Sequence, residues 1–198
     1  MTRVIADISV SLDGFVTGPD PGPGQGLGVG GEALHTWAFS DDPDDRQLVQ
    51  HATARSGAVV LGRRLFDIVD GPDGWNDEVG YGAGEVGKPP FVVVTSSPPG
   101  SVRLTELDWT FVTTGLDEAI TAARERVARD DQDVVVMGGG ATIGSALAAG
   151  LVDVLSLHLA PVVLGGGTPL FAPGASRTLV QRSVLGTSTA THLTYDVG

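Results

Sequence analysis

The chain contains no cysteine, and this absence excludes several kinds of chemistry. Disulfides, thiol nucleophiles and cysteine-ligated zinc or iron–sulfur centres all require that side chain. The four histidines, His35, His51, His158 and His192, lie far apart in the sequence and show no spacing typical of zinc ligands. We therefore expect no metal centre.

Cations and long apolar runs are also scarce. The 198 residues include 12 Lys and Arg against 24 Asp and Glu, a formal net charge of −12. Nucleic acids and anionic membranes are bound through basic patches, so neither partner is expected. No apolar run is long enough to span a bilayer, and the N-terminal residues alternate like a strand where a signal peptide would have an apolar core. We expect a cytoplasmic protein with one domain, residues 1–198.

The most informative pattern is a strand that runs through glycines into a helix. Val134–Val136 form a β-branched run typical of a buried central strand, and Gly138, Gly139 and Gly140 precede a predicted helix over 142–149. Backbone N–H groups at such a corner can approach a phosphate at the positive end of the helix. Three glycines after a strand are equally typical of a tight turn without a ligand, so this corner alone does not decide the function.

A second corner lies upstream, where the apolar run 58–61 ends in Gly62, Arg63 and Arg64. Arginine binds phosphate through paired hydrogen bonds, and two adjacent arginines stand out in so acidic a chain. Strand ends in α/β sheets favour ligands, so the pair indicates an anionic ligand. The alternative is a pair of solvated or salt-bridged surface charges.

The remaining pattern predicts further strands, helices and two long loops. Strands are expected over about 3–10, 58–61, 91–95, 110–113, 154–163, 177–185 and 189–197. The last three follow one another without helices, so they should pair antiparallel at one edge of the sheet. Helices are expected over 44–56, with Asp41 or Asp42 as the cap, and from Asp117 as the cap to about Arg129. The glycine-rich stretches 18–31 and 71–87 are long for loops, which is typical of a lid or an insert.

Several short sequence motifs occur in the same order along the chain as they do in a known protein family. They are Ser11-Leu12-Asp13-Gly14-Phe15, 61–64, 95–97, the 138–140 corner, 150–153, and 161–167 with 169–171. On these phrases the chain resembles the dihydrofolate-reductase-like family, and within it the reductase domain of the riboflavin-biosynthesis deaminase–reductase and its stand-alone relatives. The resemblance implies an α/β fold: a mixed, mostly parallel sheet flanked by helices, with antiparallel C-terminal strands. The deaminase half is not expected, because its zinc site needs cysteines.

The resemblance also implies an NADPH-dependent reductase that transfers a hydride from nicotinamide to a small heterocyclic substrate, such as a riboflavin-pathway pyrimidine or a pteridine. It implies that Gly62, Arg63 and Arg64 meet the 2′-phosphate side of the cofactor, that Thr95 and Ser96 lie by the adenosine half, and that Gly138, Gly139, Gly140, Thr142 and Ile143 hold the pyrophosphate. Two alternatives stay open: a true dihydrofolate reductase, and a catalytically idle nucleotide-binding protein on the same scaffold.

The chain departs from the family's pattern at three places. Leu65 stands where folate reductases carry a phosphate-binding threonine, and Ser96 and Ser97 stand where many stand-alone relatives carry basic residues. Selectivity for NADPH over NADH therefore rests mainly on Arg63 and Arg64. Riboflavin reductases place a glutamate just before the paired glycines, where this chain offers only Met137 or Gly138, so the resemblance does not fix the pyrimidine as the substrate.

Three side chains are candidates for proton chemistry. Asp13 lies in the turn that in this family faces the substrate, with a plain Asp-Gly turn residue as the alternative. Asp44 or Asp45 follows Pro43 in the region where folate reductases carry an acid, although a charge favoured by the helix dipole is the simpler explanation. His35 could relay a proton near neutral pH, and a surface histidine is the alternative.

Ser11, Phe15 and Trp37 are the candidates for contact with the substrate. Ser11 and Phe15 flank Asp13 in the same turn. Trp37 belongs to a Leu-His-x-Trp phrase found in stand-alone relatives, so its indole could wall the substrate pocket; an ordinary packed tryptophan is the alternative.

The C-terminal strands predict a homodimer. Residues 178–197 carry apolar side chains and few charges, which is poor protection for an edge strand. The resemblance points the same way, because riboflavin-type reductases pair through this region.

Overall fold

The structure is a computed structural model that describes residues 2–22, 24–72, 74–76, 81, 88–171 and 176–198. Most of the predicted loop 71–87 lies outside these residues. The strands are β1 (Val4–Val10), β2 (Ser56–Gly62), β3 (Phe91–Val94), β4 (Trp109–Val112), β5 (Asp133–Val136), β6 (Val154–Leu159), β7 (Leu179–Gly186) and β8 (Thr191–Val197). The helices are η1 (Gly31–Phe39), which is a 3-10 helix, α1 (Pro43–Arg55), α2 (Arg63–Val69), α3 (Leu116–Arg126) and α4 (Gly140–Ala148).

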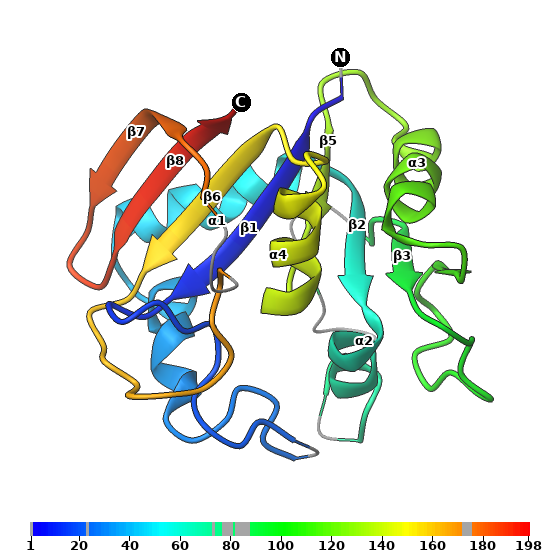
Figure 1. The fold of residues 1–198 in the computed structure, drawn as a ribbon, viewed down its shortest axis with the longest axis horizontal. Coiled ribbons are helices and arrows are strands. Elements are labelled where there is room, and N and C mark those ends of the chain that lie inside the picture. Colours follow the sequence, from blue (N-terminus) through cyan, green and yellow to red (C-terminus); the bar gives the residue numbers. More distant parts are fainter. Residues whose placement is uncertain (1, 23, 73, 77–80, 82–87, 172–175) are drawn as a thin grey trace.

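The eight strands form one sheet in the order β4-β3-β2-β5-β1-β6-β8-β7. All pairs from β4 to β6 are parallel, and β8 pairs antiparallel with both β6 and β7. This confirms the predicted mixed sheet and its antiparallel C-terminal edge, which lies at the left in Figure 1. The arrangement is the dihydrofolate-reductase-like one that the resemblance implies.

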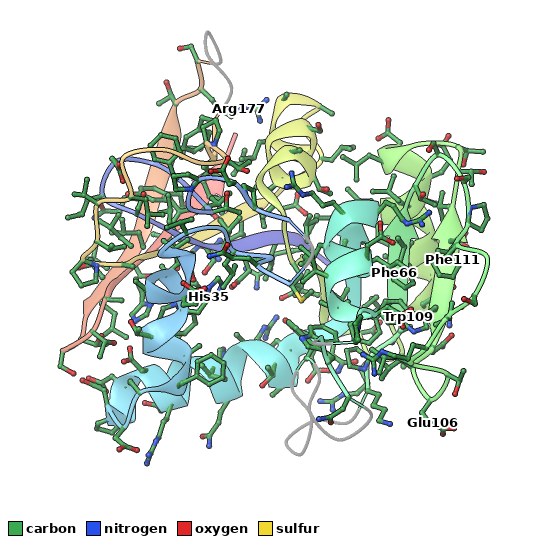
Figure 2. All side chains as sticks on the ribbon, turned by 90° about the horizontal axis from the view of Figure 1, so that it is seen from below. His35, Phe66, Glu106, Trp109, Phe111 and Arg177 are labelled. Carbon is green, nitrogen blue, oxygen red and sulfur yellow. The ribbon has the colours of Figure 1, made fainter. Side chains whose placement is uncertain are left out.

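Helices cover both faces of the sheet. Helices α3 and α4 lie on one face, and η1 and α1 lie on the other (Figures 1 and 2). Because side chains alternate along a strand, β2 serves two separate apolar cores. Ala58 and Val60 belong to the cluster that also contains residues of α3 and α4, whereas Val59 and Leu61 pack in the cluster that contains Phe66 of α2. Figure 2 shows Phe66 beside Trp109 and Phe111, with ring centroids 5.0 and 5.2 Å away.

The two glycine corners meet where adjacent strands lead to opposite faces. β2 and β5 are parallel neighbours, and their carboxyl ends lead into α2 and α4. Since α2 packs in one core and α4 in the other, the chain leaves the sheet in opposite directions at this point. Such a switch point opens a crevice at the carboxyl ends of the strands.

Several local predictions can be checked in these elements. Asp42 is the cap of α1, since its carboxylate accepts a hydrogen bond from the N–H of Asp44 at 3.0 Å, as predicted. Asp117 is not a cap: Gly115, with φ +128, is the N-cap of α3, and Asp117 lies in the first turn, where its charge suits the dipole. Strand β6 ends at Leu159, short of the predicted residue 163.

The sequence did not predict η1. Its N-cap, Gly30, has φ +73 and is one of the last residues of the glycine-rich stretch 18–31. Within the described residues, no helix combines the length and apolar character needed to cross a membrane.

Candidate active site

Two adjoining cavities open at the switch point. The first, here called the corner cavity, has a volume of about 380 Å³ and is lined by both glycine corners. The second, here called the tryptophan cavity, has a volume of about 630 Å³ and is lined by Asp7, Trp37, Trp75 and Tyr81 among others. Both are lined by Ile8, Ser9, Leu27, His35, Leu65, Ile68 and Met137. The shared lining makes them two compartments of one cleft.

Close approach of backbone shapes the corner cavity. A Cβ on Gly62 would lie 2.4 Å from the hydroxyl oxygen of Thr142, so the two corners touch only because residue 62 is glycine. Gly138 has φ +115, a conformation that side chains rarely allow, and a Cβ on Gly139 would meet no atom within 4 Å. The backbone is therefore bare beside the start of α4, where the first N–H groups have no partner inside the helix. This arrangement suits a phosphate.

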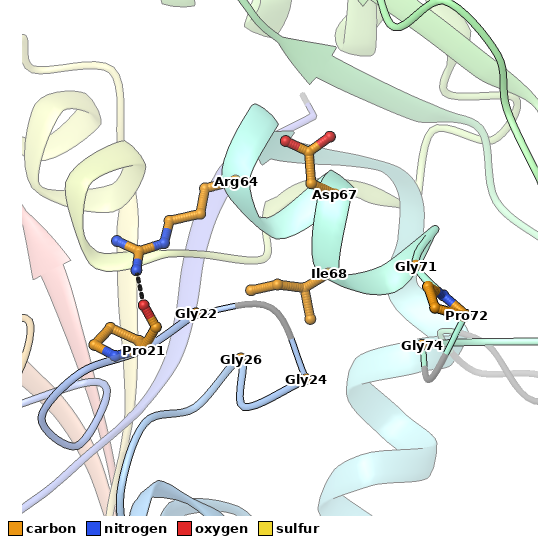
Figure 3. Close-up of a pocket in the computed structure, with 10 residues that line it drawn as sticks. All are labelled: Pro21, Gly22, Gly24, Gly26, Arg64, Asp67, Ile68, Gly71, Pro72 and Gly74. Atoms are coloured by element: carbon orange, nitrogen blue, oxygen red, sulfur yellow. Dashed lines mark hydrogen bonds between the residues drawn. The ribbon is translucent and has the colours of Figure 1, made fainter.

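The two arginines of the second corner both line the corner cavity. The Arg63 guanidinium donates to the carboxylate of Asp67 at 2.7 Å and to the carbonyl of Ser97 at 2.9 Å. Arg64 donates to the carbonyl of Pro21, and it also lines a third cavity, of about 540 Å³, between α2 and residues 21, 22, 24 and 26 (Figure 3). The salt bridge considered from the sequence is therefore present for Arg63, and it lies at the edge of the cavity.

Three predicted cofactor residues lie outside the lining of these cavities. Thr95 is buried and donates to the carbonyl of Ser97 at 2.8 Å, whereas Ser96 is exposed. Ile143 is fully buried in the core under α4. Gly62, Arg63, Arg64, Gly138, Gly139, Gly140 and Thr142 do line the corner cavity.

Aromatic side chains and one unpartnered histidine distinguish the tryptophan cavity. The indole N–H of Trp37 donates to the Ser9 hydroxyl at 2.9 Å. His35 lies on η1 (Figure 2) and faces both compartments, and its Nδ1 atom is buried without a hydrogen-bond partner in the described part of the chain. Burial and the nearby His158 lower the pKa of His35, and Asp7 opposes them only in part. A neutral imidazole with a free nitrogen suits a ligand's polar atom.

The predicted turn around Asp13 contributes no residue to the lining of either compartment. The Asp13 carboxylate accepts hydrogen bonds from the backbone N–H groups of Leu164 and Gly165, at 3.1 and 2.7 Å. The Ser11 hydroxyl accepts a hydrogen bond from the N–H of Phe15, and Phe15 forms an isolated antiparallel β-bridge with Pro169. Ser11, Asp13 and Phe15 thus join this turn and neighbouring loops, and none of them lines the cleft.

Asp45 is fully buried at the start of α1 and does not reach the cleft directly. Its carboxylate accepts from the hydroxyls of Ser40 and Thr189 and faces His192. Burial opposes its ionisation, yet these hydrogen bonds hold the pKa of Asp45 at about 2. Through His192 and His158 it is linked to Asp7, which does line the tryptophan cavity.

Sequence reasoning missed Asp7, His158 and His192 as site residues. A signal was present, because Asp7 and Ser9 alternate with apolar residues along the first strand, and so do Ser156 and His158 along β6. Alternation of this kind marks one face of a strand as polar. On that face these side chains meet η1 and α1.

Residues 2–193 match the RibD C-terminal domain family. The chain belongs to this family. No curated protein matches the sequence.

Solved structures of similar fold include riboflavin biosynthesis proteins and a folate reductase. A candidate riboflavin biosynthesis protein from Shewanella sp. PV-4 has a TM-score of 0.71 and 21% identity, covering 100% of this chain and 99% of that one. The diaminohydroxyphosphoribosylaminopyrimidine deaminase/5-amino-6-(5-phosphoribosylamino)uracil reductase of Thermotoga maritima has a TM-score of 0.63 and 15% identity, covering 100% of this chain and 57% of that one. Dihydrofolate reductase from Enterococcus faecalis, complexed with NADP(H) and RAB-propyl, has a TM-score of 0.56 and 17% identity, covering 99% of this chain and 96% of that one. At these identities the likeness establishes the fold alone.

Proposed function

We propose that the protein is a cytoplasmic reductase that uses NADPH to reduce a small heterocyclic molecule. The continuity of the two compartments carries the proposal: a corner suited to phosphate opens directly into an aromatic cavity through shared residues such as Leu65 and Met137. A dinucleotide needs a phosphate site and a reaction site within one cleft. The family match and the reductase neighbours support this reading.

The residues of the corner cavity fit the cofactor. Gly138–Gly140 and the start of α4 would hold the pyrophosphate, with Thr142 as a hydroxyl donor, and Arg63 and Arg64 would meet the 2′-phosphate. Thr95 and Ser96 would lie toward the adenosine end. When bound, the nicotinamide supplies a hydride. The chain's own part is to orient the ligands and to exclude water, to which Gly26 and Leu27 of the 18–31 loop contribute by lining the cleft.

The tryptophan cavity fits a flat, polar ring. Trp37 and Trp75 offer aromatic faces, and His35 offers a nitrogen without a partner among the described residues. A riboflavin-pathway pyrimidine has this character, and the named activity of the Thermotoga relative supports it. Dihydrofolate has it too, and the likeness to the Enterococcus reductase keeps that substrate as the second candidate.

We propose further that the protein is a homodimer joined through its C-terminal strands. β7 is the edge strand of the sheet, and along most of its length its side chains are exposed. Val180 and Val184 are 63% and 53% exposed. A second copy placed on a two-fold axis would cover this edge.

A binding and turnover experiment tests the function. NADPH, NADH, FMN and dihydrofolate are titrated in turn by calorimetry, and NADPH oxidation is then followed with 5-amino-6-(5-phosphoribosylamino)uracil and with dihydrofolate. We expect NADPH to bind and the pyrimidine to be reduced. Turnover of dihydrofolate with sensitivity to antifolates would favour the second candidate, and NADPH binding without turnover of either substrate would favour an idle nucleotide-binding protein. Failure of NADPH to bind would refute the proposal.

A further inference from the structure

Four polar side chains form a continuous buried row behind the tryptophan cavity. Asp7 Oδ1 lies 3.2 Å from His158 Nε2, His158 Nδ1 lies 2.8 Å from His192 Nδ1, and His192 Nε2 lies 2.9 Å from Asp45 Oδ1. The two histidines and Asp45 are almost completely buried, whereas the Asp7 side chain is 29% exposed and lines the cavity. The row therefore has one open end, at Asp7.

Strand register builds this row. His158 of β6 pairs directly with His192 of β8, and Asp7 stands two residues before Ser9, which pairs with His158 across β1 and β6. All these side chains point to the face covered by η1 and α1. Trp37 of η1 stacks on His158, with ring centroids 4.0 Å apart and planes 30° apart, and Asp45 closes the row from α1.

The contacts fix the number of protons. Each of the three contacts has hydrogen-bond length and needs one proton between its two atoms. Two neutral imidazole rings supply only two N–H protons, one each. A complete row therefore holds one proton more than neutral rings provide, and without it a bare ring nitrogen would face a carboxylate or another bare nitrogen.

The location of the extra proton follows from Asp45. This carboxylate stays ionised under ordinary conditions, so it accepts the Nε2–H of His192. The Nδ1 atom of His192 is then left as an acceptor, because burial lowers the pKa of His192 and keeps it neutral. His158 must donate through Nδ1, and its Nε2 carries the extra proton in the contact with Asp7. The stacked indole of Trp37 favours the charged ring.

We propose that Asp7, His158, His192 and Asp45 form a proton-delivery row that presents one dissociable proton to the tryptophan cavity at Asp7. Asp7 is the catalytic residue, and Asp45 and His192 are positioning residues that act through His158. The catalytic part rests on the proposed reductase function.

The proton balance of a reduction is complete with this row. When a C=N bond is reduced, its carbon receives the hydride with its electron pair and its nitrogen receives the proton. The Nε2–H bond of His158 breaks, the proton passes by way of the Asp7 carboxylate, and an N–H bond forms on the substrate. His158 is left neutral with its Nδ1–H still donated to His192, and after product release one proton taken up from solvent at the exposed end, at Asp7, restores the Nε2–H of His158.

Several titratable groups surround the open end of the row. His35 of η1 lies close enough to feel the charges of His158 and Asp7, and burial, with a smaller contribution from the Asp7 charge, raises the pKa of Tyr81. Ser156 of β6 donates a hydrogen bond to Asp7. Burial opposes ionisation of Asp7, but His158, Ser156 and His192 together outweigh it, so the pKa of Asp7 lies below its ordinary value. Asp7 thus passes the proton on and does not store it.

Nitrogen NMR on histidine-labelled protein tests the row without substrate or cofactor. In the wild type we expect His192 protonated at Nε2 and bare at Nδ1, and His158 protonated at Nδ1 and, in the complete row, at Nε2 as well. A His192 ring protonated at Nδ1, or a His158 Nε2 bare throughout the pH range in which the protein is folded, would overturn the proposal. The wild-type spectrum decides this point even if a variant does not fold.

Variants then test delivery. Asp7→Asn keeps the shape of the side chain but removes the carboxylate that accepts and passes on the proton, so the single-turnover rate should fall about 100-fold or more with NADPH affinity unchanged. Asp45→Asn should release the fixed tautomer of His192 and move the pH profile of the rate toward lower pH. Asp131→Asn, the same change at a surface carboxylate paired with Arg129, should alter neither.

The two proposals fail in different ways. Protein that does not bind NADPH but shows the expected ring tautomers would refute the reductase function and support the row. Protein that reduces a substrate at the same rate and with the same pH profile after Asp7→Asn would support the function and overturn the row.

Discussion

Selectivity for NADPH over NADH should depend on Arg63 and be limited by Asp67. In the structure Arg63 lines the corner cavity, but its guanidinium is shared with Asp67 at 2.7 Å. A 2′-phosphate binding at this corner would have to displace or share that contact. Two substitutions separate the effects: Arg63→Ala removes the phosphate ligand, and Asp67→Asn removes its competitor.

The expected magnitude follows from the two interactions. A charge-assisted hydrogen bond to phosphate contributes about 1.5–3 kcal/mol. The Arg63 and Asp67 side chains are 37% and 52% exposed, so solvent screens their ion pair and breaking it costs only about 0.2–1 kcal/mol. The difference leaves a preference for NADPH of roughly 2- to 100-fold in Kd. Asp67→Asn should tighten NADPH by a further factor of about 1.4–5, and it should leave NADH unchanged.

Calorimetric titration of both cofactors measures these effects. Arg63→Ala should bring the two affinities close together, mainly by weakening NADPH. Arg129→Ala, at an exposed arginine paired with Asp131, is the matched control and should change neither affinity. Equal affinities for NADPH and NADH in the wild type would refute the assignment of the 2′-phosphate to this corner.

Three further predictions concern residues outside the corner. If Asp13 anchors the 164–165 loop through its carboxylate, Asp13→Asn should lower the melting temperature and spare the turnover of the folded protein; an unchanged melting temperature with lost turnover would instead support the catalytic role expected from the sequence. Hydrogen bonds hold the pKa of Asp45 at about 2 against burial, so its contribution to stability is complete above about pH 4 and is lost as the pH falls toward 2; urea unfolding across this range should show a flatter acid limb for Asp45→Asn. The homodimer predicts a dimeric mass by light scattering at micromolar concentration, converted to a monomeric mass by Val184→Glu but not by the control Val163→Glu; a monomeric wild type would contradict it.

Much of the fold could be predicted because its signals are local. The β-branched runs at 58–61 and 134–136 are buried neighbours in the sheet, and their glycine corners meet at Thr142. The antiparallel C-terminal edge followed from the absence of helices there. Each of these inferences needs only the order of residues along a short segment.

The tryptophan cavity and its buried row could not be predicted in the same way. His158 and His192 face each other only because of the register between β6 and β8, and Asp45 joins them only because α1 folds back over that face. The sequence indicates Asp45 for a different reason, its place after Pro43. It indicates Asp13 because of its turn, and in the structure the Asp13 carboxylate binds the 164–165 loop, a placement that depends on how distant loops pack.

A chain with a net charge of −12 must keep its carboxylates from repelling an anionic ligand, and the placement of its acids shows how this is possible. Near the phosphate corner, Asp67 is neutralised by Arg63. The acids of the buried row lie beyond the apolar lining shared by the two compartments, which includes Leu65 and Met137. With one extra proton, two carboxylates and two histidines carry a net charge of −1. The cleft can therefore combine a cationic corner for phosphate with an acidic end that donates protons, because the same apolar residues separate the two charges.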